Sequence, residues 1–319
     1  MYYPSGYYRG KARAALKGHW QTALLICLIV SLPSLLTQGI AMYTGNDPMD
    51  RMQSLIVQAS RDGVLSEALI VTEARTFLQS TGYIVTQSLS ALAWLITPFL
   101  TLGMYNWMIG RLRGKEEPVT TVFSRAKLFL RAIGLQLMII LEVLLWMLPG
   151  IAAAVISIVP VVRAETQAEL QQAVTVCNRF MLPILLLMII PGAIAGLRLA
   201  MAEFVMADRP GMKIRASMKQ SREMMKDQKR GLFLLMVSFL LWYLLQMFVS
   251  SFLSGMGSGV FALVFQMASG LAIQAYMSCS MAAFYQEIRF PEIPQTQEAV
   301  NDPAPEEAVP GETSAEAAE

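Results

Sequence analysis

Six long apolar runs divide this chain and constrain its fold more than any other feature. A helix rises about 1.5 Å per residue, so about 20 apolar residues cross a hydrocarbon core about 30 Å thick. The runs are continuous rather than alternating, which excludes the strands of a membrane barrel. The sequence therefore predicts an all-α, polytopic membrane protein with six transmembrane helices. They are expected at residues 20–43, 82–109, 132–162, 180–206, 232–253 and 260–285.

The composition agrees with this class and limits the chemistry. Hydrophobic residues make up 55% of the 319 residues and charged residues 15%, with a mean hydropathy of +0.48, whereas a soluble domain carries about 25% charged residues. Cys27, Cys177 and Cys279 sit singly in or beside apolar runs. The sequence therefore offers neither a disulfide framework nor a paired-cysteine metal site.

The first run could also be read as a cleaved signal peptide, because Gly39-Ile40-Ala41 resembles a small-x-small cleavage site. Its apolar core is longer than the usual ~7 to 15 residues of a signal peptide. We therefore expect a retained helix.

The Lys and Arg residues between the runs alternate between high and low numbers. There are four in 1–19, three in 44–81, six in 110–131, two in 163–179, nine in 198–231 and none in 254–259. Because basic residues near helix ends stay cytoplasmic, both termini are expected in the cytoplasm of a plasma-membrane protein. Segment 44–81 is then external, and the acidic tail 286–319 is cytoplasmic and expected to be disordered, either as a solubilising end or as a docking tail for a basic partner.

A basic helical stretch precedes the first, third and fifth runs, which predicts three helical hairpins, each entered through a basic, amphipathic interfacial helix. The segment 1–19 is the first of these, and 211–230 is the clearest. With 100° per residue, Ile214, Met218, Ser221 and Met225 fall on one side of that helix. The basic side chains fall together on another side and are candidate contacts for lipid head groups, anionic ones in particular. Simple retention of positive charge on one side of the membrane would select the same residues. These residues are Arg215, Lys219, Arg222 and Lys226.

Residues 199–242, "LAMAEFVMADRPGMKIRASMKQSREMMKDQKRGLFLLMVSFLLW", resemble the signature of a bacterial integral membrane protein family known as domain of unknown function 975. "ARAALKGHW", residues 12–20, and "AAFYQEI", which contains Phe284 and Tyr285, resemble the first and last elements of that family. The resemblance implies a polytopic plasma-membrane protein of unassigned function. Its motif residues are Asp208, Pro210, Ser217, Ser221, Trp242, Gly18 and Trp20.

Glu142 is the one acidic residue expected deep in a run, the eleventh residue of the third. A carboxylate there costs at least about 2.5 kcal/mol on insertion scales and is by default a functional hypothesis. No basic residue is expected at its depth, so a neutral Glu142 would hydrogen-bond to Gln87, Gln246 or Gln274. Two interpretations remain open: a clamp between helices, or a proton or ion relay.

No catalytic motif accompanies these features. His19 is the only histidine, and no Walker-type loop, HExxH, GxSxG or CxxC is present. The sequence therefore predicts no enzyme, no cofactor, no metal ion and no nucleic-acid partner. It favours a protein that organises lipids or helps to assemble envelope or membrane proteins, with lipids and a membrane protein as partners. The alternative is a small transporter that uses Glu142. A membrane enzyme would need Glu203, Asp208 and Glu223 to form a water-accessible cluster.

Overall fold

The computed structural model describes residues 4–44, 81–163, 166–257 and 259–289, and within these ranges every regular element is a helix. Six of these helices are long and apolar enough to cross a membrane, which confirms the predicted class. Residues 45–80 of the predicted external segment and 290–319 of the predicted tail lie outside the described residues. The elements are α1 (Ser5–Leu16), α2 (Trp20–Thr44), α5 (Thr81–Leu112), the 3₁₀ helix η1 (Val119–Leu128), α6 (Phe129–Arg163), α7 (Gln167–Leu199), α8 (Ala202–Asp208), α9 (Ile214–Met224), α10 (Lys229–Gly255) and α11 (Gly259–Arg289).

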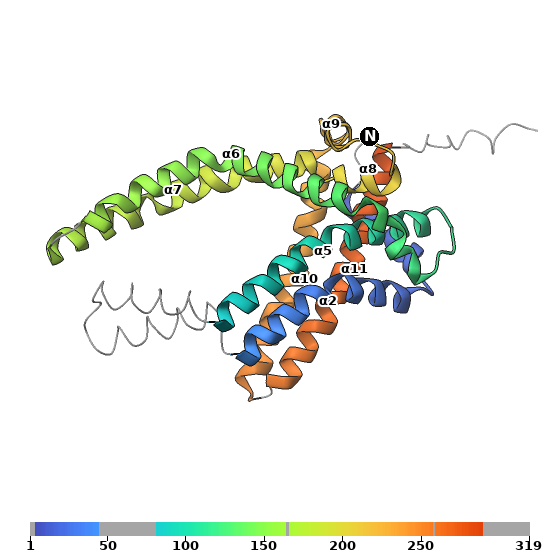
Figure 1. Ribbon diagram of the computed structural model, residues 1–319, viewed down its shortest axis with the longest axis horizontal. Helices are drawn as coiled ribbons and strands as arrows, with labels where there is room; N and C mark the ends of the chain where they lie inside the picture. Colours follow the sequence, from blue (N-terminus) through green and yellow to red (C-terminus); the bar gives the residue numbers. More distant parts are fainter. Residues whose placement is uncertain (1–3, 45–80, 164–165, 258, 290–319) are drawn as a thin grey trace, which may run out of the picture.

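The long helices pair as three hairpins, α2 with α5, α6 with α7, and α10 with α11. Helices α2, α5, α10 and α11 form a four-helix body, and the α6/α7 hairpin extends away from one end of it (Figure 1). Both helices of the hairpin exceed 30 residues, so each is longer than the ~20 residues that a perpendicular span requires.

Four shorter helices gather at one end of the body, which we call the capped end. Helix α1 packs on α11, η1 and α8 pack on α5, and α9 packs on α8 (Figure 1). The turn from α1 to α2 depends on Gly18, whose φ of 82° is costly for any residue with a Cβ atom. This turn folds α1 back so that its apolar stripe, Tyr8, Ala12 and Leu16, is buried. The apolar face of α1 therefore packs against the protein rather than against lipid.

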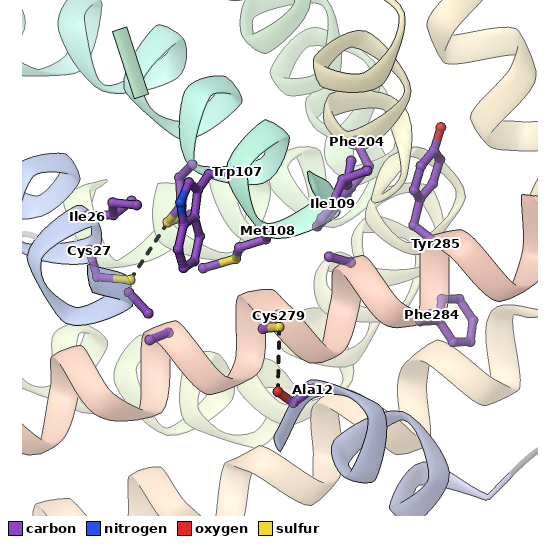
Figure 2. Close-up of a cluster of buried hydrophobic side chains, with 14 of the residues drawn as sticks. Ala12, Ile26, Cys27, Trp107, Met108, Ile109, Phe204, Cys279, Phe284 and Tyr285 are labelled. Carbon is purple, nitrogen blue, oxygen red and sulfur yellow. Dashed lines mark hydrogen bonds between the residues drawn. The ribbon is translucent and has the colours of Figure 1, made fainter. Parts of the chain in front are cut away.

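The main core lies where α1, α2, α5, α8, α10 and α11 meet (Figure 2). Trp107 of α5 is fully buried, and its Nε1 donates to the carbonyl of Glu117 at 3.0 Å. Helices α2 and α5 meet at Cys27 and Met104, with the sulfur atoms 3.8 Å apart, and Cys279 of α11 lies 3.9 Å from the carbonyl oxygen of Ala12. The body therefore holds its helices together with large side chains and polarizable sulfur.

Three boundaries differ from those expected. The fourth run, 180–206, is divided: α7 ends at Leu199, and α8 turns so that Phe204 and Val205 enter the main core. Helix α7 also begins earlier, at Gln167, because Thr166 and Glu169 form a capping box there. The helix expected over 211–230 covers only Ile214–Met224, and the chain turns before α10 begins at Lys229. Tertiary contacts and capping, which hydropathy does not report, set all three boundaries.

Candidate functional site

Asp208, the last residue of α8, lies between two arginines and a tyrosine. Its Oδ1 accepts a hydrogen bond from Arg113 Nη1 at 2.8 Å, and its Oδ2 accepts one from the Tyr285 hydroxyl at 3.0 Å. Arg289 forms an ion pair with the same Oδ2 and donates to the Tyr285 hydroxyl at 3.1 Å. Only 7% of the Asp208 side chain is exposed. A carboxylate matched in this way joins α5, α8 and α11 electrostatically and is not available as a base.

A column of aromatic rings leads from this cluster into the body. Tyr105 and Phe204 stack with ring centroids 4.0 Å apart, and Phe204 and Tyr285 lie 5.9 Å apart and nearly parallel. In Figure 2 the hydroxyl of Tyr285 points away from the buried side chains that surround α11. Tyr105 also lies close enough to Glu203, at the start of α8, for the two side chains to interact electrostatically. The column thus connects two carboxylates of α8 that use different partners.

The third carboxylate considered for a catalytic cluster lies elsewhere. Glu223 is on α9, with 67% of its side chain exposed, and its Oε1 is 3.9 Å from Lys219 Nζ. Glu203, Asp208 and Glu223 therefore do not form one water-accessible site. Among the described residues, no group of three or more His, Cys, Asp or Glu side chains could hold a metal ion.

Helix α9 turns one face to the protein and the other to its surroundings. Ser217, Met218 and Ser221 are buried, and the Ser221 hydroxyl donates to the carbonyl of Arg198 at 2.9 Å, near the end of α7. The helix is thus fixed to the base of the α6/α7 hairpin and to α8. The candidate head-group side chains are exposed: Arg215, Lys219 and Arg222 lie on α9, and Lys226 lies in the turn that follows it.

Glu142 does not have the partners that the sequence suggested. Its Oε2 accepts a hydrogen bond from Arg222 Nη2 at 2.5 Å, and 17% of the carboxylate side chain and 41% of the arginine side chain are exposed. Counting residues along α6 gave no basic neighbour at this depth. That count assumed that α9 stays away from α6, but α9 lies against the base of the hairpin and brings Arg222 to it.

The candidate glutamines point elsewhere. Gln246 donates to the carbonyl of Gln266 at 2.8 Å within the α10/α11 hairpin, and Gln274 accepts from Ser31 at 3.1 Å between α11 and α2. Gln87 lies exposed on α5. Two of the three glutamines thus connect helices of the body, and neither of those two contacts Glu142.

The family-motif residues have distinct structural positions. Gly18 forms the first turn, and Trp20 lies beside Tyr276 with ring centroids 6.3 Å apart. Ser217 donates to the carbonyl of Lys213 within α9 at 3.3 Å, and the carbonyl of Pro210 accepts from Arg131 at 3.1 Å. Trp242 is half exposed on α10. Most of these residues shape the capped end.

Sequence reasoning missed Arg113 and Arg289, which complete the Asp208 cluster. One signal was present: Tyr285 and Arg289 are four residues apart, which places them on one face of a helix. Arg113 carries no such signal, because only the packing of α5 against α8 brings it to Asp208.

Comparison with known proteins identifies one relationship. A family profile described as "Protein of unknown function (DUF975)" matches residues 1–291. Neither the curated proteins nor the solved structures contain a significant match.

Proposed function

This chain belongs to the DUF975 family of proteins of unknown function, and from that premise we propose that it is a non-enzymatic protein that gathers anionic lipids around its capped end. By doing so it organises lipids locally or assists the assembly of other membrane proteins. The proposal includes an orientation in the plasma membrane with both termini and the capped end in the cytoplasm, because the basic segments 1–19, 110–131 and 198–231 meet there.

One observation carries the proposal: α9 presents its basic side chains outward from a helix that is fixed by its buried face. The Lys219 side chain is 79% exposed, and its one ion pair, with Glu223, spans 3.9 Å. Such a contact between exposed groups contributes little. Arg215 and Lys226 are exposed as well. Each basic side chain near an anionic membrane surface gains about 1 kcal/mol.

Arg222 has a different role in this proposal. Its contact with Glu142 supports its use as a tie between α9 and α6 rather than as a head-group ligand. The same contact gives Glu142 a counter-charge, as a tie between two helices requires. The transport alternative therefore has less support than lipid binding.

The test uses full-length protein in nanodiscs that contain phosphatidylglycerol as a minor component in phosphatidylcholine. Enrichment of phosphatidylglycerol around the protein is measured by fluorescence transfer to a labelled lipid, at low and high salt. We expect R215E/K219E to lose the salt-sensitive enrichment, because two of the outward charges are reversed.

The matched control is R163E/R179E, which makes the same charge change at two exposed residues in the outer part of the hairpin. It should keep the wild-type enrichment. Equal enrichment in both double variants would reject lipid gathering by α9.

A further inference from the structure

A half-open cleft of about 490 Å³ lies between α1, the end of α5 and the end of α11. Its volume is within the range of small-molecule sites. Its walls carry three basic side chains, Lys11, Arg111 and Arg113, and one acid, Glu287. None of these residues belongs to α9, so the cleft is separate from the surface considered above.

Two of the three basic side chains in the cleft form ion pairs with described acidic side chains, and Arg111 does not. Lys11 Nζ pairs with Glu287 Oε2 at 2.9 Å, and Arg113 pairs with Asp208. The polar contacts of Arg111 with described residues involve no acidic side chain: its Nη2 lies 2.8 Å from His19 Nδ1, and its Nη1 donates to the carbonyl of Lys115 at 3.1 Å. Within the described part of the chain, its Nε is buried and has no hydrogen-bond partner. Arg111 therefore contributes a positive charge and a donor that an anion can use.

Within the described chain, Glu287, in contrast to Arg111, lacks a hydrogen-bond donor at one of its carboxylate oxygens. The residue is 7% exposed, and its Oε2 accepts hydrogen bonds from Lys11 and, at 3.4 Å, from the Tyr7 hydroxyl. Its other oxygen, Oε1, is buried and has no partner among the described residues. A buried charged acceptor without a donor is costly, so the site favours a ligand that supplies an N–H or O–H group.

The cleft lies at the level where lipid head groups are expected. Arg111 and Arg113 directly follow the apolar part of α5, and Glu287 follows that of α11, while Gln286 ties the two helices by donating to the carbonyl of Ile109 at 3.0 Å. Charged side chains at helix ends meet the phosphates of the interface.

We propose that this cleft binds the head group of a phospholipid that carries a hydrogen-bond donor beyond its phosphate, such as phosphoethanolamine or phosphoglycerol. The phosphate contacts Arg111, and the ammonium or hydroxyl group donates to Glu287 Oε1. This inference rests on the proposed function, because it names one lipid chemistry that the capped end selects.

The experiment is native mass spectrometry of the full-length protein released from nanodiscs of phosphatidylcholine with about tenfold less phosphatidylethanolamine, so that selective retention of the minor lipid stands out. The trimethylammonium group of phosphatidylcholine has no N–H, so it serves as the internal control. Wild type should retain phosphatidylethanolamine selectively. R111M should lower that retention about tenfold, the loss expected for one charge-assisted hydrogen bond.

Two further variants separate the site from general charge and from folding. K115M removes one positive charge from an exposed neighbour in the same turn and should keep the selectivity. E287M should lose the preference for phosphatidylethanolamine over phosphatidylcholine. A cooperative thermal unfolding transition of E287M checks that this variant is still folded. Retention of both lipids alike by wild type, or an equal loss in K115M and R111M, would overturn the site.

Soluble glycerophosphoethanolamine distinguishes a lipid from a free phosphate ester. We expect it to compete weakly, since it lacks acyl chains, and stronger binding than the lipid would overturn the lipid source. The R215E/K219E variant should keep the selective retention. If R215E/K219E also keeps the salt-sensitive enrichment of phosphatidylglycerol, the proposal for α9 fails. The proposal for the cleft is then decided by the retention of phosphatidylethanolamine alone.

Discussion

The four-helix body and the α6/α7 hairpin are both built from long apolar helices, yet only the body has a core. The largest buried side chains, including Trp107, Phe239 and Tyr285, belong to the body and its cap, apart from Leu135 at the base of α6. Along the hairpin, Leu141, Leu145, Ile156 and many similar side chains are exposed, and a smaller cluster with Ala132, Leu135 and Leu199 holds only its base. High hydropathy therefore marks the surface that faces lipid, and side-chain size and shape mark where helices pack.

The two regions also differ in how closely their backbones approach. A Cβ atom at Gly103 of α5 would overlap the backbone of Val122 in η1, and one at Gly150 of α6 would lie 2.7 Å from the backbone of Met188 in α7. The first contact holds the cap on the body, and the second holds the two helices of the hairpin together.

The largest effect is expected for G103A. The new methyl group meets backbone rather than a flexible side chain, so the cost should exceed the ~1–3 kcal/mol typical of overpacking. G150A should cost about 1–3 kcal/mol and loosen only the hairpin. Thermal unfolding in detergent and hydrogen exchange along α6 and α7 measure the two effects. G196A is the control, because a Cβ atom there meets nothing within 4 Å; general unfolding by G150A would contradict the separation of the two regions.

Loss of an ion pair should also destabilise the protein more in the capped body than in the hairpin. D208A leaves two arginines of the cap without their carboxylate and should destabilise the protein by about 3 kcal/mol, as for a buried pair that loses one partner. E142Q weakens a contact at the base of the hairpin whose arginine is 41% exposed, so the expected loss is below about 1 kcal/mol. Equilibrium unfolding by denaturant compares the two, and a larger loss in E142Q would reverse the comparison.

The smallest expected effect is a difference in the reactivity of the native cysteines between the hairpin and the body. Cys27 and Cys279 are fully buried in the body, whereas Cys177 on α7 is partly exposed. A maleimide should therefore label the folded protein once, at Cys177, and should not label C177S. In intact cells a membrane-impermeant maleimide should also react, since 163–179 is predicted to be external. Labelling of C177S at the wild-type rate would show that the body opens as readily as the hairpin.

The sequence by itself determined the class of this protein, the six membrane-spanning helices and their pairing as hairpins. Apolar length is a local property that can be counted along the chain. The basic segments likewise indicated which end would be cationic. The resemblance to the family followed from short motifs, and Gly18 and Asp208 within them have clear structural roles.

Only the tertiary structure decided which residues meet. Among the glycines of the hairpin, the close backbone contact is at Gly150, whereas Gly192 meets only the flexible side chain of Met147, and residue type does not distinguish the two. The sequence also assigned glutamine partners to Glu142, which instead pairs with Arg222, and it did not join Arg113 and Arg289 to Asp208. The physical reason is common to all three: such contacts depend on where helices cross and how they are tilted, and neither property is encoded in the length or hydropathy of a single helix.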